Sequence, residues 1–387
     1  MNFLKKIILL NYHISQIFFW KEFKYIVNEF FSNIEKTNNL RKFLKKNIKF
    51  EKKKSNVSFS FKNTFLFSSN LGLFIINESQ IQKIFAGDVH GVSICKDVVF
   101  FSVFTGIHSS IIKAKLIRNK LSFELREKER ILSFETLYGN ERIHGLSFDK
   151  ETGNLCFANT QRNSICYVDI NKKKIVNEIF IMKDKTGLSI SSDHNHVNSV
   201  NCINNFVLFT CHSGSVGIKK RGASLVGFTD KKKIFFFKIT NRGVHDINLI
   251  SNDLYICDSF GNYKTYTGRL LRNGKPYMEN LLRRFSSNYM LRGLGISGNE
   301  FLIGCSNINP DRSLRKKKSG GLIFMCEKNI FFKKLQSSQI NEIKCVNDID
   351  VRVGKANLLK IFEKSFGKCI YQQEIEKNFI SKKINLI

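Results

Sequence analysis

The chain has 387 residues, 42% of them hydrophobic, which is enough for a large core and would ordinarily suit two or three domains. The formal net charge is +31, but lysine is scattered throughout, and no RNA-binding aromatic motif, helix-turn-helix or zinc-finger spacing accompanies it. These features exclude a disordered chain, and we do not expect nucleic-acid binding as the main role.

Residues 1–55 are predicted to form a basic, amphipathic helical extension. They contain no glycine or proline, aromatic and aliphatic residues recur at helix-like spacing, and basic residues crowd between residues 41 and 54. Two interpretations stay open: a helix packed on the main domain, or one that docks on an anionic membrane surface or on a partner.

No targeting or membrane-spanning segment is predicted. The apolar run at residues 7–10 is too short for the hydrophobic region of a signal peptide, and no stretch reaches 18 apolar residues. We therefore expect a cytoplasmic protein, with peripheral contact between residues 1–55 and a membrane as the alternative.

From residue 56 the pattern changes to short β-like runs separated by Gly, Asn, Asp and Ser, and it repeats. Five units begin at His90, His144, His196, His245 and Arg292, so successive starts lie 54, 52, 49 and 47 residues apart. Each unit reads as a strand, a tight polar turn and a second strand, followed by further strands. A period near 40–50 residues with about four strands is typical of propeller blades.

The ends of the repeat predict how the ring closes. A partial unit at residues 57–77 precedes the first full unit, and a further start at Asn341 follows the last. If these two pieces share one blade, the ring has six blades and no exposed inner edge; if they are independent, it has seven. The predicted fold is an all-β, six-bladed β-propeller over residues 56–365, with residues 366–387 as a C-terminal tail.

The ten cysteines indicate buried, reduced thiols. None forms a CxxC pair, and four lie within apolar runs, at Cys156, Cys211, Cys257 and Cys305. A free cysteine packs as a small hydrophobic residue, and this usage favours a reducing compartment.

A repeated histidine is the main candidate for chemistry. His90, His144, His196 and His245 are predicted at one equivalent position, the first residue of each innermost strand, so they form a ring at one mouth of the channel. Such a ring could hold a divalent metal, Zn or Fe. Arg292 takes this position in the fifth unit, where its guanidinium could bind a carboxylate, phosphate or sulfate.

Three roles for the histidines stay open: structural bonds to a neighbouring blade, a metal site, or metal-free acid–base chemistry and substrate binding. With Arg292, the residues His212 and Asp258, which follow second strands, are the candidates for substrate binding at the same mouth. No catalytic residue is assigned, because the chain has no nucleophile elbow, Walker loop, Rossmann fingerprint or HExxH motif.

Two stretches resemble known propellers. His144-Gly145-Leu146-Ser147-Phe148, with the turn at Gly153, resembles the repeats of NHL-type propellers, the group that includes streptogramin lyase and peptidylglycine amidating lyase. Residues 291–294, 304–306 and 312–315 resemble an uncharacterised family of bacterial propellers often encoded beside surface-polysaccharide genes. Together these resemblances cover residues 56–350.

The resemblance implies a six-bladed fold. Channel histidines hold zinc in the amidating lyase, which implies a metal at His90, His144, His196 and His245, although this chain lacks the signal peptide of a secreted lyase. The predicted function is binding of, or action on, an anionic or sugar-like small molecule at the histidine mouth. The alternative is a non-catalytic scaffold that binds protein partners in a surface-glycan pathway, and whether the protein is an enzyme is left open.

Overall fold

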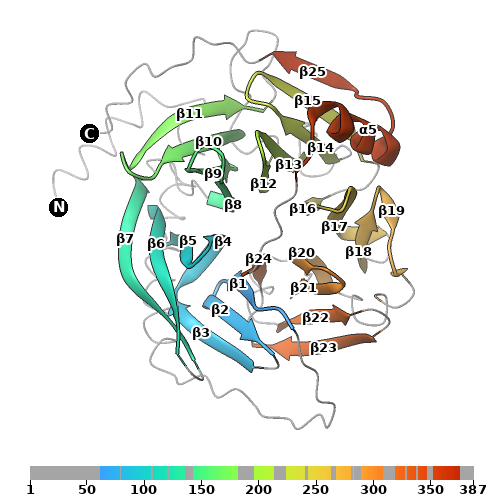
Figure 1. The fold of residues 1–387 in the computed structure, drawn as a ribbon. Helices are drawn as coiled ribbons and strands as arrows, with labels where there is room; N and C mark the ends of the chain where they lie inside the picture. Colours follow the sequence, from blue (N-terminus) through green and yellow to red (C-terminus); the bar gives the residue numbers. More distant parts are fainter. Residues whose placement is uncertain are drawn as a thin grey trace, which may run out of the picture.

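Six antiparallel sheets are arranged around a central axis as the blades of a propeller (Figure 1). The computed structural model describes residues 62–78, 80–105, 108–119, 122–135, 143–181, 196–212, 224–239, 243–262, 267–279, 282, 289–307, 319–326, 329–336, 339–346 and 352–374. The predicted six-bladed, all-β fold is confirmed for this part of the chain, and the seven-bladed alternative is wrong. The helical extension predicted over residues 1–55 lies outside the described residues.

In each blade, the strands follow one another from the channel outwards. Blade 1 has β24 (Ile340–Cys345), β1 (Phe65–Ser69), β2 (Gly72–Asn77) and β3 (Gln80–Ala86); blade 2 has β4 (Asp88–Cys95), β5 (Val98–Phe104), β6 (His108–Arg118) and β7 (Phe123–Glu135); blade 3 has β8 (Ile143–Asp149), β9 (Asn154–Asn159), β10 (Ser164–Asp169) and β11 (Lys174–Phe180). Blade 4 has β12 (Ser199–Ile203), β13 (Phe206–His212), β14 (Ser224–Thr229), β15 (Lys233–Lys238) and β25 (Tyr371–Glu374); blade 5 has β16 (Val244–Ile250), β17 (Asp253–Asn262), β18 (Thr267–Arg272) and β19 (Lys275–Pro276); blade 6 has β20 (Tyr289–Ser297), β21 (Glu300–Asn307), β22 (Gly320–Cys326) and β23 (Asn329–Leu335).

Blade 1 closes the ring from both ends of the repeat, as the sequence predicts. Its innermost strand β24 comes from the end of the chain and pairs antiparallel with β1, with Cys345 opposite Phe65 and Ile343 opposite Phe67. The innermost strands contact one another in the order β24, β4, β8, β12, β16, β20 and back to β24. Pairing first and last segments leaves neither with an open inner edge.

The core consists of apolar layers between adjacent blades. Leu66 and Ile75 of blade 1 pack with Val92 and Phe101 of blade 2, and all four side chains are essentially inaccessible to solvent. Successive side chains of a strand point to opposite faces of the blade, so apolar residues on both faces contribute to such layers. The predicted buried thiols belong to them: Cys156, Cys211, Cys257 and Cys305 are buried and free, and burial raises the pKa of each thiol.

A β-bulge recurs near the start of the innermost strands and explains the glycine after the histidine. The strand register shifts between His144 and Leu146, and Gly145 lies at the shift with φ +41°. A Cβ atom at Gly145 would lie 3.0 Å from the Cα atom of Ser199 on the next blade. Blade 6 has the same shift, with Gly293 at φ +80°. Glycine suits this position because it allows positive φ and a close approach between blades.

The C-terminal segment packs against blades 4 and 5. Helix α5 (Lys355–Phe366) buries Leu358 and Phe362 against apolar residues of β14 to β17. Strand β25 then pairs with β15 as a fifth strand, with Tyr371 opposite Phe236. Part of the segment predicted as a C-terminal tail therefore completes blade 4. No helix in the described ranges is long and apolar enough to cross a membrane.

Candidate functional site

Three of the predicted histidines lie side by side where the inner strands begin. The ring centroids of His90 and His144 are 5.4 Å apart, and those of His144 and His196 are 5.7 Å apart. The Nε2 atom of His90 is 3.2 Å from the Oδ1 atom of Asp88 on the same strand. The row of imidazoles thus joins blades 2, 3 and 4.

His196 does not occupy the position predicted for it. Val200 pairs with Phe209 as Leu146 pairs with Phe157, so Asn198, two residues before Val200, is the counterpart of His144. His196 precedes β12 and has φ +46°. The prediction was wrong by two residues because strands alternate with a period of two, and a two-residue shift leaves the pattern of inward and outward side chains unchanged.

This first inner-strand position joins neighbouring blades. The Nδ2 atom of Asn198 donates a hydrogen bond to the carbonyl of Val244 on blade 5 at 2.9 Å. The Nδ2 atom of Asn341, its counterpart in blade 1, donates to the carbonyl of Val89 on blade 2 at 2.7 Å. In both cases the accepting carbonyl belongs to the residue directly before the equivalent position of the next blade. Asn198 and Asn341 therefore link neighbouring blades, which is a structural role.

His245 has a similar structural role through a serine. The hydroxyl of Ser259 donates to the carbonyl of Leu291 on blade 6 at 2.7 Å, so its single proton is already used. The Nδ1 atom of His245, 2.5 Å from the same hydroxyl and 3.3 Å from the carbonyl of Gly243, must then carry the proton and donate. The hydrogen bonds therefore assign the Nδ1–H tautomer to His245 and connect it to blade 6.

The remaining candidates do not converge on one point. Asp258 is fully buried and forms an ion pair with Arg269 of the neighbouring strand, at 3.0 Å. Arg292 lies half-buried in β20, and His212 ends β13, its side chain lying outside the described part of the structure. Within the described ranges, no group of three or more His, Cys, Asp or Glu residues is arranged to hold a metal ion. Metal binding stays a prediction.

Two carboxyl groups lie one residue further along the inner strands, inside the channel. The Oε2 atom of Glu342 accepts hydrogen bonds from the backbone N–H groups of Val92 at 2.7 Å and Leu146 at 3.1 Å, so it joins blade 1 to blades 2 and 3. The Oδ2 atom of Asp246 accepts one from the N–H of Gly293 at 2.7 Å. Burial raises the pKa of both carboxyl groups, and that of Glu342 reaches about 7.

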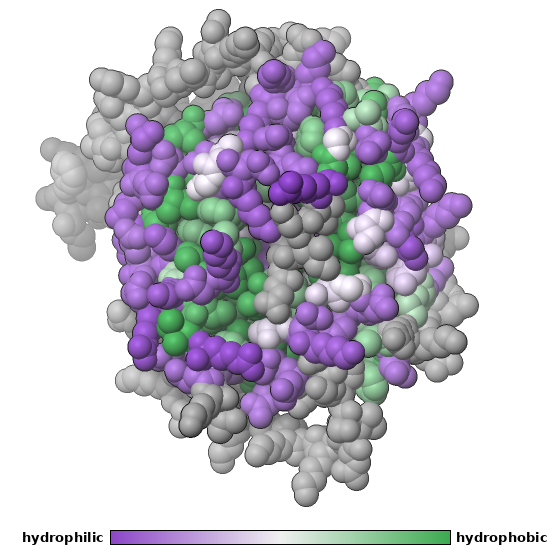
Figure 2. Space-filling model, viewed as in Figure 1, coloured by the Kyte–Doolittle hydropathy of each residue, from purple (hydrophilic) through white to green (hydrophobic). Residues whose placement is uncertain are grey.

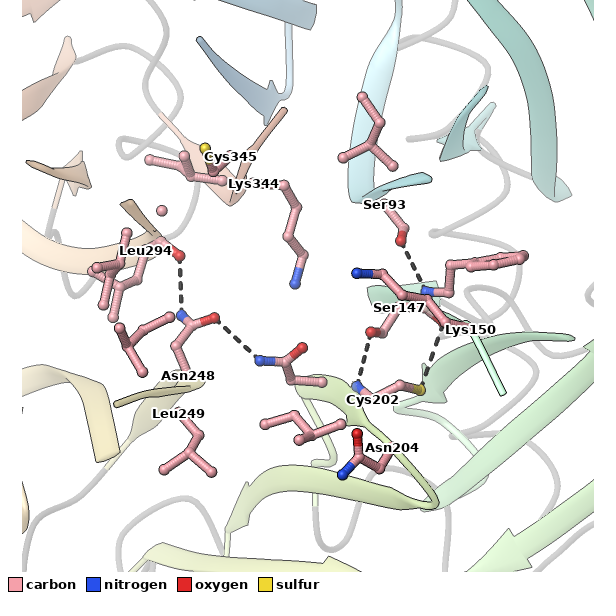
Figure 3. A pocket seen from close by; sticks show the side chains of 18 of the residues that line it. Ser93, Ser147, Lys150, Cys202, Asn204, Asn248, Leu249, Leu294, Lys344 and Cys345 are labelled. Carbon is pink, nitrogen blue, oxygen red and sulfur yellow. Dashed lines mark hydrogen bonds between the residues drawn. The ribbon is translucent and has the colours of Figure 1, made fainter. Parts of the chain in front are cut away.

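The described residues enclose a pocket at the other mouth, where the inner strands end. It has a volume of about 880 Å³ including its opening. All six blades line it, and one inner-strand position supplies five of its polar residues: Ser93, Ser147, Asn201, Asn248 and Lys344. Blade 6 has Gly295 at this position. Figure 3 shows the side chain of Lys344 extending from β24 into the open centre. Lys150, Glu151 and Asn204 lie further out on the same lining.

Hydrogen bonds between blades hold these polar side chains in place. The hydroxyl of Ser93 accepts from the N–H of Phe148 at 2.9 Å, and that of Ser147 accepts from the N–H of Cys202 at 2.8 Å (Figure 3). Both serines are bonded to the following blade, so their oxygen positions are fixed. Each hydroxyl still has its own proton to donate.

The two asparagines form a chain that fixes their amide orientation. The Nδ2 atom of Asn201 donates to the carbonyl of Ile247 at 3.1 Å and to the Oδ1 atom of Asn248 at 3.2 Å. The Nδ2 atom of Asn248 in turn donates to the carbonyl of Leu294 at 3.1 Å. This chain leaves the Oδ1 atom of Asn201 as an acceptor beside the hollow.

The pocket therefore presents donors and an acceptor in fixed places. Lys344 supplies an ammonium group, which lies 3.2 Å from the Oε1 atom of Glu342 and forms an ion pair with it. Ser93 and Ser147 supply hydroxyl donors, and Asn201 supplies an acceptor. Such a set complements a small molecule that carries both an anionic group and hydroxyl groups.

Sequence reasoning did not find this pocket, although its signal was present. The fourth residue of the units is Ser93, Ser147, Asn248 and Lys344 in four of the blades, a polar residue between apolar ones. The sequence-based prediction relied on the repeated histidine at the first position of each unit. That position lies at the opposite mouth of the channel.

The comparisons with known proteins bear on the fold alone. No protein-family model and no curated protein matches the chain. Among solved structures, it is similar to a putative 6-phosphogluconolactonase from Bacteroides fragilis, with 12% identity, coverage of 76% of this chain and 99% of that one, and a TM-score of 0.42. It is also similar to a gluconolactonase from Xanthomonas campestris, with 8% identity, coverage of 75% and 85%, and a TM-score of 0.42.

A third structure belongs to the group named from sequence. A catalytically inactive virginiamycin B lyase from Staphylococcus aureus, solved with quinupristin, has 13% identity, coverage of 66% of this chain and 80% of that one, and a TM-score of 0.36. These values are too low to carry any residue role across. The function must be argued from the site itself.

Proposed function

We propose that this propeller binds a small organic anion with several hydroxyl groups, of the sugar-acid or sugar-phosphate class, in the pocket where its inner strands end. The observation that carries the proposal is the ring of polar side chains around Lys344. Five inner strands place a serine, asparagine or lysine at one level, and all of them line the same hollow.

The charge of the pocket selects the ligand class. The Lys344 side chain is 19% exposed, so its ammonium is partly withdrawn from solvent, where a charge-assisted hydrogen bond to a carboxylate or phosphate is stronger than at the surface. Lys150 adds a second positive charge at the rim. A neutral sugar would use the hydroxyl and amide groups but not these charges.

The surface favours a small ligand over the scaffold alternative. Among the described residues, the large hydrophobic side chains exposed at the surface are Val176 and Ile370. Hydrophilic side chains cover most of the described surface on the face shown in Figure 2. The core of a stable protein interface is usually rich in aromatic and other apolar side chains, and the described residues expose few large ones.

Calorimetric titration with D-gluconate, 6-phospho-D-gluconate and neutral D-glucose tests the proposal. We expect both anions to bind more tightly than glucose. The Lys344→Met variant should bind the anions at least ten-fold more weakly, because one charge-assisted hydrogen bond contributes roughly 1.5–3 kcal/mol. Lys232→Met, on an exposed turn outside the pocket, is the matched control and should bind as the unmodified protein does.

Two results would contradict the proposal. One is equal anion binding by the Lys344→Met variant with its fold intact by circular dichroism. The other is binding that survives Lys344→Met but is lost in Arg292→Met, which would return the ligand to the histidine mouth predicted from sequence.

A further inference from the structure

The anion pocket lies directly beside a buried carboxyl group. Glu342 and Lys344 are two residues apart on β24, so their side chains leave the strand on the same face. The Nζ atom of Lys344 is 3.2 Å from the Oε1 atom of Glu342. The ammonium reaches the pocket, while the carboxyl group stays enclosed, its side chain only 4% exposed. An anion held by Lys344 would therefore lie close to Glu342.

This arrangement deepens the proposed function and rests on it. We propose that Glu342 takes up one proton from solvent when an organic anion binds to Lys344, so that the pocket binds the anion and the proton together. No covalent bond changes in this step: the proton moves from water to the Glu342 carboxylate, and the complex gains no net charge from a monovalent anion.

The groups around Glu342 keep its two ionisation states close in free energy. Lys344 and the backbone N–H groups of β4 and β8 favour the carboxylate, whereas burial and the negative charge of Asp246 on β16 favour the acid. Arg292 on β20 lowers the pKa of Asp246. The balance places the pKa of Glu342 at about 7, so both forms are populated near neutral pH.

From the described parts of β4 and β8, the backbone N–H groups of Val92 and Leu146 donate hydrogen bonds to this carboxyl group. His90 and His144 lie two residues before the two amide donors, at the opposite mouth. An anion bound to Lys344 would favour the protonated form of Glu342. It weakens the ion pair that stabilises the carboxylate, and it adds a like charge nearby.

The coupling has a definite sign with pH. Because the bound state holds the proton more tightly, anion affinity rises as pH falls through the pKa of the free protein. A further rise of one to two pKa units on binding corresponds to an affinity about five- to ten-fold higher at pH 6 than at pH 8. D-gluconate suits the measurement because its carboxylate stays ionised throughout this range.

The test is titration calorimetry with D-gluconate at pH 7, in two buffers that differ in ionisation enthalpy. The difference in measured heat gives the number of protons taken up per gluconate bound. We expect a value near 0.5 for the unmodified protein, since about half of the Glu342 side chains start protonated. Glu342→Gln, which still offers an oxygen to the two N–H groups, should show no uptake and little pH dependence.

Glu151→Gln is the matched control, because Glu151 is a carboxylate on the lining of the same pocket. Glu151→Gln should bind gluconate more tightly, because it removes a negative charge from the lining, but it should show the same proton uptake and the same pH dependence as the unmodified protein. Gluconate binding without proton uptake, or uptake that persists in Glu342→Gln, would overturn the inference and leave the proposed function standing. No gluconate binding at either pH 6 or pH 8 would overturn both.

A second measurement needs no ligand. Infrared difference spectra of the free protein between pH 6 and pH 8.5 should contain a protonated-carboxyl band that is lost in Glu342→Gln and kept in Glu151→Gln. If the band attributable to Glu342 is missing at pH 6, the carboxyl group is already ionised there and the proposed coupling is wrong.

Discussion

The hydroxyl of Ser93 accepts a hydrogen bond from the backbone N–H of Phe148, 2.9 Å away on the next blade. Ser147 repeats the contact one blade further on, with the N–H of Cys202. The side chains that face the pocket therefore also hold the inner strands together. Structural and binding roles meet in the same residues, and the two can be separated only by comparing stability with affinity.

Ser93→Ala and Ser147→Ala should each lower the free energy of unfolding by roughly 1–2 kcal/mol. Each substitution leaves a partly buried backbone N–H without its acceptor, and that loss dominates the cost. Urea unfolding followed by circular dichroism measures it. Ser133→Ala is the control: Ser133 is exposed and bonds only to the hydroxyl of Ser110 within its own blade, so a change below about 0.5 kcal/mol is expected.

His245 should tolerate asparagine better than alanine. Asparagine already occupies the equivalent position in blades 1 and 4, where its amide donates to the neighbouring blade. His245→Ala leaves the Ser259 hydroxyl without its donor and a cavity in place of the ring, so we expect a loss of roughly 2–3 kcal/mol. His245→Asn should cost about half as much. Equal losses in urea unfolding would argue against a blade-linking role and favour chemistry specific to imidazole.

The stability of the protein should fall as pH rises from about 5 to about 7, through Glu342. Burial raises the pKa of this carboxyl group from 4.5 to about 7, so between these values the folded state binds more protons than the unfolded state. Stability then decreases with pH in this window and levels off above it. The contribution is at most roughly 3 kcal/mol.

Glu342→Gln isolates this contribution, because glutamine does not titrate. The difference in unfolding free energy between the variant and the unmodified protein should move in favour of the variant as pH rises from 5 to 7. A difference that is flat across this range would show that the carboxyl group keeps its ordinary pKa in the folded protein. The same urea series on Glu151→Gln serves as the control, and no such trend is expected there.

The ring of blades was predictable because its signal is local and repeated. Each inner strand alternates apolar residues with polar ones and ends in a tight turn, and the spacing of the units matches one blade each. The closure of β1 onto β24 also followed from the partial units at the two ends of the repeat. Such patterns depend on the two-residue period of β-strands, which is the same in every blade.

The site was not predictable in the same way. Repetition showed that His90, His144 and His245 are equivalent, but not whether that position faces a ligand or a neighbouring blade. The tertiary structure decides this: Asn198, Asn341 and His245 at that position all contribute to bonds between blades. It also decides that Asn198, not His196, belongs to the set, because strand pairing sets the register.

By itself, the sequence indicated a propeller of six or seven blades, the approximate places of the inner strands and the buried thiols, since each depends on the order of apolar and polar residues along the chain. Only the tertiary structure showed that the described residues form a pocket at the mouth where the inner strands end. The six inner strands come from segments as far apart as β4 and β24, and their pocket-lining residues, among them Ser93 and Lys344, meet only when the ring closes. Lys344 and Glu342 already lie together on β24, and ring closure adds the serine and asparagine side chains of the other blades to the same pocket.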